Sequence, residues 1–209
     1  MSSGETEETQ TIALFPLRAV LFPNGRLPLQ IFEQRYIDLI SQSLRNDKGF
    51  GICLLSEGEE VVQPGKSQQV HRVGTYARIV DWDELPSGLL GVTVEGRQKF
   101  MVEECWAAEN QLLMARVRFC PIDVVGIDPI PVESAHEDLV TLLQQLSSHP
   151  VIEKLNMSLD FENVRELAWR LSELIPLSLE AKQELLEVTD PMQRIDRIEA
   201  LLAEIIDQR

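Results

Sequence analysis

The spacing of apolar residues along the chain changes near residue 120. Before this point, short apolar or alternating runs separated by glycine, proline and asparagine predict β-strands. After it, apolar residues recur every three or four positions, as on one face of a helix. The pattern predicts an α+β protein with an acidic disordered tail over residues 1–10, a β-rich part over 11–120, a proline-rich linker over 121–132 and a helical part over 133–209.

The β-rich part contains one segment with helical spacing among its strands. Residues 115–119 alternate apolar side chains with arginines, which is typical of a strand with one buried and one solvated face. Pro28 places its strand at a sheet edge, because proline lacks the N–H that a central ladder needs. Gly96 is expected to separate two strands. The expected strands are 11–17, 27–31, 50–55, 70–82, 89–94, 98–106 and 112–119, and the expected inserted helix is 33–46.

About four helices are expected after the linker, and their first residues show capping chemistry. Ser134 and Glu137 have the spacing of a capping box. Asp160 and Ser178 are expected to cap the next two helices. Asp190-Pro191 is an N-cap followed by proline at the first helical position. Each helix has one apolar face, so the faces are expected to pack together in a bundle.

The charge of the chain argues against several classes of partner. The formal net charge of the 209 residues is −15, and residues 123–209 hold 18 acidic but only 7 basic residues. Such a surface repels phosphate backbones, so a nucleic-acid partner is not expected. No apolar run approaches the ~18 residues of a membrane span, and the first residues lack the pattern of a signal peptide. An odd set of three cysteines without CxxC spacing then suggests reduced thiols in the cytoplasm.

Three blocks of the sequence, in order, match one known family. The blocks are Pro16-Leu17 with Phe22-Pro23, Pro28-Leu29, Ile31-Phe32-Glu33 and Arg35-Tyr36; Gly74-Thr75 with Ala77, Ile79, Trp82, Leu85-Pro86, Gly88-Leu89, Gly96 and Phe100; and Leu186, Val188, Asp190-Pro191 and Arg194. Over about residues 10–209 the chain resembles the N-terminal, substrate-binding domain of the ATP-dependent Lon protease. It resembles more closely the stand-alone bacterial proteins made of that domain alone.

The resemblance implies a PUA-like β-barrel subdomain with an inserted helix, followed by an all-α helical bundle subdomain. In Lon this region helps to capture unfolded or tagged polypeptides and to organise the oligomer. The ATPase and the Ser-Lys protease follow it in the full-length enzyme, and the present sequence shows neither the Walker A motif nor the dyad. The resemblance therefore implies binding of unfolded or degradable polypeptides, with a protease as a further partner, and not catalysis.

The residues themselves also predict no catalytic site, no metal and no cofactor. Residues 64–67 read Pro-Gly-Lys-Ser, but a phosphate-binding loop needs a glycine where this chain has Glu60. His71, His136 and His149 lack metal-ligand spacing, and surface or capping roles are expected for them. The serines and cysteines show no nucleophile motif.

A basic strip on the sheet is the basis of an alternative function. Arg97, Lys99, Arg116 and Arg118 could together attract RNA, and PUA-like folds in other families bind RNA or small molecules. Aromatic residues for base stacking are scarce between them. A solvated sheet face with cross-strand ion pairs is the favoured interpretation.

Apolar residues in the proline-rich first loop and in one hairpin are the candidate binding site. Loops with many large apolar side chains often expose a binding patch, although these residues could instead close one end of the barrel. Replacement of Trp82 or Phe22 by a charged residue is expected to weaken peptide binding without unfolding the protein. A further alternative is that the last helix pairs between chains to form an oligomer. The predicted peptide-binding patch comprises Phe15, Phe22, Pro23, Pro28, Ile31, Phe32 and Trp82.

Overall fold

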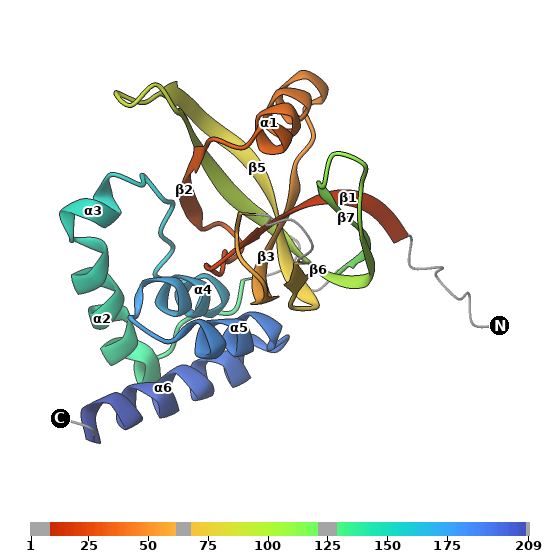
Figure 1. Cartoon of the computed structure of the whole chain (residues 1–209). Coiled ribbons are helices and arrows are strands. Elements are labelled where there is room, and N and C mark those ends of the chain that lie inside the picture. Colours follow the sequence, from red (N-terminus) through yellow and green to blue (C-terminus); the bar gives the residue numbers. More distant parts are fainter. Residues whose placement is uncertain (1–8, 62–67, 121–128, 208–209) are drawn as a thin grey trace.

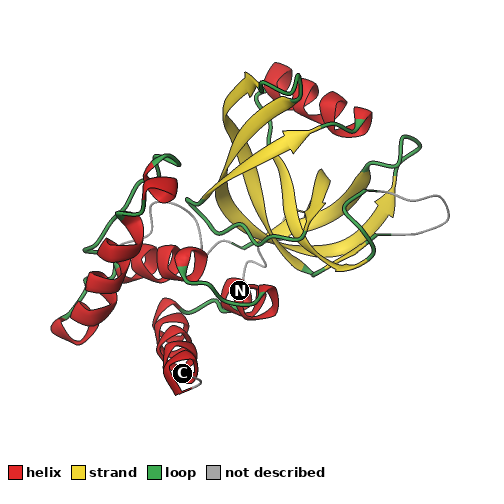
Figure 2. Cartoon of the chain, turned by 60° about the vertical axis from the view of Figure 1, so that its left-hand side comes forward, coloured by secondary structure: helices red, strands yellow, loops and turns green. Residues whose placement is uncertain are grey.

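The chain folds into a β-barrel beside a group of helices, which confirms the predicted α+β class. The computed structural model describes residues 9–61, 68–120 and 129–207. Residues 1–8 of the predicted tail, residues 62–67 with their Gly-Lys-Ser sequence, and residues 121–128 of the predicted linker lie outside the described residues. The prediction of disorder is wrong for residues 9 and 10, which begin strand β1 (Thr9–Leu17). In both Figure 1 and Figure 2 the helical part lies on one side of the barrel, and α1 (Gln34–Asn46) packs on the barrel away from it.

The barrel is a sheet that closes through its first strand. Its path runs β1-β7-β6-β5-β3-β4, and β1 also pairs in parallel with β3, which closes the ring among the described residues. β2 pairs antiparallel with the first residues of the long strand β6, where Leu29 lies opposite Val92. The strands are β1 Thr9–Leu17, β2 Arg26–Ile31, β3 Phe50–Glu57, β4 Gln69–Val70, β5 Val73–Glu84, β6 Leu90–Ala107 and β7 Leu113–Phe119.

The helix α1 covers one end of the barrel core. Its apolar side chains Tyr36, Leu39 and Ile40 are buried in one cluster with Phe15 and Phe50 of the strands. Asp47 follows the helix in the left-handed conformation, and its N–H donates to Ser43 O. The helical spacing of the sequence therefore predicted the helix, and the structure shows that only the middle of its apolar face is covered, since Leu44 is exposed.

The strand pattern was wrong at two places. Gly96 does not separate two strands, because β6 runs unbroken through it and the pairing with β5 shifts there instead. A Cβ atom on Gly96 would lie 2.2 Å from the carbonyl oxygen of Phe22, so glycine is needed for this close approach. The expected strand 70–82 is divided into β4 and β5.

Two of the predicted helix caps are confirmed and two are displaced. Ser178 Oγ accepts from the N–H of Ala181, and Asp190 Oδ1 accepts from that of Met192 at 2.7 Å. Asn163, not Asp160, caps α4. The helical part comprises the 3-10 turn η2 Ser134–His136 and the helices α2 Glu137–Ser147, α3 Pro150–Glu153, α4 Val164–Leu174, α5 Leu179–Glu187 and α6 Pro191–Asp207.

The capping box before α2 begins one residue earlier than the sequence pattern predicted. Glu133 occupies the N-cap of η2, and His136 Nδ1 accepts from the backbone N–H of Glu133 at 3.2 Å. His136 is buried there, so it has the capping role expected for one of the histidines. Serine at 134 is instead the first residue of the 3-10 turn.

The core of the helical part is built around α4. Leu167, Ala168 and Leu171 of this helix are fully buried and pack with side chains of α2, α5 and α6. The apolar stripe of α6 contributes Ile195 and Ile198 to the same cluster. Most of the stripe is thus covered within the chain, although pairing between chains through α6 stays a prediction.

Candidate functional site

A notch opens in the barrel wall between β1, β2 and α1. It has a volume of about 250 Å³, which is enough for one large side chain. Three residues of the predicted patch, Phe15, Pro28 and Phe32, meet here. The lining residues are Phe15, Leu17, Pro28, Leu29, Gln30, Phe32, Glu33, Tyr36 and Glu60.

Stacked aromatic rings form the back of the notch. The rings of Phe15 and Tyr36 lie 3.9 Å apart between centroids and are nearly parallel, and Phe50 packs behind Phe15. The Tyr36 hydroxyl has no hydrogen-bond partner among the described residues. Burial raises the pKa of this phenol, so it stays neutral at physiological pH. The back wall is therefore aromatic and uncharged, with one polar atom, the Tyr36 hydroxyl oxygen.

Arg35 holds the rim of the notch in place. Its buried guanidinium pairs with Glu33 at 3.0 Å and donates to the carbonyl oxygens of Gln111 and Glu60. It also lies over the Tyr36 ring, 4.3 Å from the centroid. One cation thus ties α1 to the β6–β7 turn and to the loop after β3, which fixes the geometry of the notch.

The outer side of the notch is open to solvent. The Phe32 side chain is 57% exposed although it is fully apolar, and Pro28 is also exposed. Among the described residues β2 has one ladder partner, β6, so its other edge is free, as Pro28 predicted. An unpaired strand edge is a place where an extended peptide can add to a sheet, and here an exposed phenyl group lies beside it.

The other loop residues of the predicted patch are not on the surface. Phe22 is fully buried and packs on Trp169 of α4 with 5.7 Å between ring centroids. Pro23 is buried beside it, and Ile31 belongs to the barrel core. The expectation of one exposed patch is wrong for these residues and for buried Phe15. A charged residue in place of Phe22 would lie in the core and destabilise the fold. Such a variant therefore cannot separate an effect on binding from an effect on stability.

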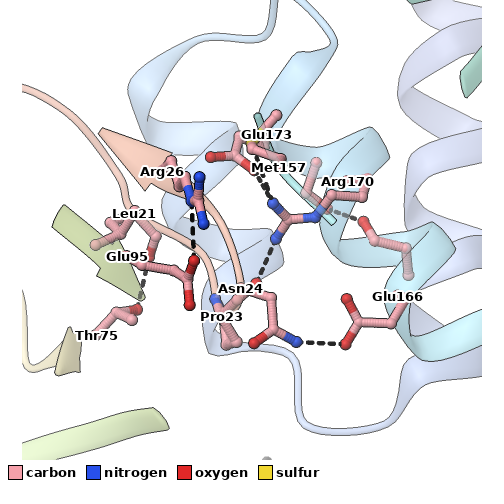
Figure 3. A network of polar contacts seen from close by, with 12 residues as sticks. Leu21, Pro23, Asn24, Arg26, Thr75, Glu95, Met157, Glu166, Arg170 and Glu173 are labelled. Carbon is pink, nitrogen blue, oxygen red and sulfur yellow. Dashed lines mark hydrogen bonds and ion pairs between the residues drawn. The ribbon is translucent and has the colours of Figure 1, made fainter. Parts of the chain in front are cut away.

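The turn after Phe22 is instead a junction between the barrel and α4 (Figure 3). Arg170, fully buried, donates to the carbonyl oxygen of Pro23 and pairs with Glu173. The Asn24 amide donates to Glu166 at 2.7 Å. Burial raises the pKa of both glutamates, while Arg170 opposes that shift. The junction is thus a polar network in which Arg170 pairs with Glu173 and the Glu166 carboxylate accepts from Asn24.

A second junction joins the barrel to the end of α5. Lys99 of β6 is buried and donates to the carbonyl oxygens of Leu186 and Val188. Arg194 of α6 donates to those of Leu185 and Val188 and lies 3.3 Å above the Trp169 ring centroid. These two cations satisfy carbonyls that α5 leaves without helical partners.

Trp82 lies apart from the notch. It is on β5, in the hairpin with β6 that projects beyond the ring of strands in Figure 1, and its side chain is 60% exposed. Val92 separates it from Leu29 of the notch, one strand on each side. The structure therefore places Trp82 on the surface, as expected, but about two strand spacings, roughly 10 Å, from the notch.

The basic strip does not form as one surface. Arg97 pairs with Glu95, while Arg116 and Arg118 both pair with Glu103 across the sheet. Lys99 is buried in the second junction described above. These ion pairs agree with the solvated sheet face that the sequence favoured, and they leave no strip of unpaired positive charge among these residues.

Other chemistry is sparse in the part of the chain that the structure describes. No group of three or more His, Cys, Asp and Glu side chains lies close enough to hold a metal. Cys53 is buried, which raises the pKa of its thiol. Over the same residues, none of the helices has the length and apolar character needed to span a membrane.

Sequence reasoning missed several residues of the notch and both junctions. Leu17, Leu29 and Tyr36 fit the apolar patterns of their own elements, so nothing marked them as a joint lining. Arg170 and Arg194 did leave a signal, since each interrupts the apolar face of a helix. Charged residues on such a face are buried only with partners.

Comparison of the chain with known proteins identifies a family. Residues 11–204 match the model of the ATP-dependent protease La (LON) substrate-binding domain. The Lon protease of Brevibacillus choshinensis is 28% identical over 203 residues, which are 95% of this chain and 25% of that protein. The Lon protease of Solibacter usitatus is 26% identical over 208 residues. The chain spans about a quarter of the length of these relatives.

Solved structures show the same fold. The Lon N-terminal domain protein from Xanthomonas campestris superposes with a TM-score of 0.71 at 28% identity, over 91% of this chain and 98% of that one. The N-terminal domain of Mycobacterium avium complex Lon protease superposes with a TM-score of 0.58 at 15% identity, a likeness of fold alone. The chain belongs to the family of the ATP-dependent protease La (LON) substrate-binding domain.

Proposed function

We propose that this chain is a non-catalytic polypeptide-binding module, an adaptor or sensor for unfolded or degradable proteins. The observation that carries the proposal is the notch, where an exposed phenyl group borders a pocket with aromatic side chains at its back and a free strand edge. The match to a substrate-binding domain supports the same class of ligand. The free Cys53 and Cys105 thiols support a reducing, cytoplasmic setting.

Binding at the notch would combine two contributions. An extended segment adds to the free edge of β2 through main-chain hydrogen bonds, which do not depend on sequence. One of its apolar side chains enters the pocket between Phe15 and Phe32, where burial of apolar surface stabilises the complex. Such a site selects unfolded chains, because folded proteins offer neither an extended backbone nor an exposed core side chain.

The test is binding of a labelled, reduced and alkylated polypeptide that stays unfolded, followed by fluorescence anisotropy. Phe32→Ser should weaken binding about tenfold, the loss typical of a central apolar contact. Leu44→Ser is the matched control, because Leu44 is an exposed apolar residue near the far end of helix α1, which begins two residues after Phe32. Thermal unfolding of both variants should stay close to that of the wild type.

Equal binding by the Phe32→Ser variant and the wild type would rule out the notch. Equal weakening by the Leu44→Ser variant would indicate general surface hydrophobicity instead of a site. Trp82→Ser is measured alongside, since loss of binding in that variant alone would move the site to the β5–β6 hairpin.

A further inference from the structure

The helical part has a groove of its own, far larger than the notch. It lies between α2 and the extended segments that precede η2 and α4, and its open volume is about 960 Å³. In Figure 1 α2 stands at the outer side of the helical part. The described residues that line the groove are Pro129, Pro131, Val132, Glu133, Ser134, Glu137, Val140, Thr141, Gln144, Asp160, Phe161, Glu162 and Asn163.

Both walls of the groove are regular and well connected. One wall is a short bridge between the two extended segments, where Val132 N–H donates to Glu162 O at 3.0 Å and Val164 N–H donates to Ile130 O at 2.8 Å. The other wall is one face of α2, whose lining residues are three, four and seven positions after Glu137. The shape of the groove is thus set by hydrogen-bonded backbone.

The groove combines apolar and acidic side chains. Phe161 and Val140 pack at the edge of the helical core and provide apolar surface inside it. Glu133, Glu137 and Glu162 are exposed carboxylates around them, joined by Asp160 as the fourth. No lysine, arginine or histidine is among the described lining residues, and no described cation pairs with any of these four acids.

The helix N-termini reduce the electrostatic cost of placing the four acids close together, but they do not neutralise the acids. Glu137 is in the first turn of α2, and Glu162 immediately precedes the N-cap of α4. The partial positive charges at the N-terminal ends of both helices stabilise carboxylates there. That partial charge is smaller than the four full negative charges. The groove therefore keeps a concentrated negative potential over an apolar floor.

We propose that this groove binds an extended basic segment of a partner polypeptide, in which lysine or arginine residues flank an apolar side chain. The apolar side chain rests on Phe161 and Val140, while the cations reach the surrounding carboxylates. The site is separate from the notch between β1, β2 and α1, so the proposal does not depend on the function proposed for the notch.

The probe is a fluorescein-labelled peptide of two leucines flanked by lysines, followed by anisotropy at low and high ionic strength. Glu137→Lys should weaken its binding about tenfold, and the double variant Glu137→Lys with Glu162→Lys should weaken it further. Asp138→Lys is the matched control, because Asp138 is the next residue in the same exposed first turn but does not line the groove. This control should change binding less than about threefold.

Several results would overturn the proposal. Equal weakening by Glu137→Lys and Asp138→Lys would show general attraction to an acidic protein, and unchanged binding in the double variant would exclude the groove. Phe32→Ser should leave binding of this peptide unchanged, and a loss in that variant would place the peptide in the notch. A matched peptide with glutamates in place of lysines should not bind, and its binding would exclude charge recognition.

Discussion

The turn that contains Phe22 and the notch that contains Phe32 come from one proline-rich stretch, yet one is buried and the other is open. The turn is held by Arg170 and Trp169, which α4 brings to it. No element of the described chain covers Phe32. The difference shows that apolar content alone does not indicate binding, because what matters is whether another element arrives to cover it.

The largest expected effect is a difference in stability between variants of these two phenylalanines. Phe22→Ala should lower the free energy of unfolding by roughly 3–5 kcal/mol, because it leaves a cavity against Trp169. Phe32→Ala should lower it by less than about 1 kcal/mol, since the side chain is mostly exposed already. Urea unfolding followed by circular dichroism measures both. Similar losses in the two variants would contradict the distinction between junction and notch.

The second prediction concerns the polar side of the junction between the barrel and α5. Arg194→Met should destabilise the protein by about 2–3 kcal/mol, because carbonyl oxygens of Leu185 and Val188 lose a buried donor. Arg197→Met is the matched control on the same helix, where an exposed pair with Glu184 is worth roughly 0–0.5 kcal/mol. Thermal melting compares the two, and an equal shift in melting temperature would refute the assignment.

The smallest effect is a pH dependence of the first junction. Burial raises the pKa of Glu166 above its ordinary value of 4.5, so the folded state binds a proton more readily than the unfolded state. The free energy of unfolding contributed by this group therefore rises as pH falls through the raised pKa toward 4.5, and it is lost at neutral pH. Glu166→Gln should then give a small gain in the free energy of unfolding at pH 7, because the amide carries no charge that burial disfavours.

This gain should shrink as the pH falls, which denaturant unfolding at several pH values between neutral and mildly acidic would detect. A gain that stays constant with pH would show that Glu166 does not titrate in this range. The notch offers a contrast, since its Tyr36 phenol has a raised pKa and stays neutral throughout. The Tyr36 phenol should therefore contribute no pH dependence to peptide binding at the notch over the same range.

Local patterns predicted most of the elements, but not the patch. The strand alternation of 115–119, the edge position of Pro28 and the caps at Ser178 and Asp190 each depend on neighbours in sequence. The partner of Pro23 is 147 positions away, on α4. No local spacing carries that information, so the sequence could suggest that the loop is apolar but not which residues are covered.

The sequence by itself determined the α+β composition, the order of elements, the acidic helical part and the resemblance to the Lon substrate-binding family. These follow from periodicity, capping chemistry, charge and motif order, which act over a few residues at a time. The tertiary structure alone decided that Phe15, Pro28 and Phe32 share a notch, while Phe22 joins two parts of the molecule. Burial is a property of packed surfaces, and those surfaces come from segments that are distant in the chain.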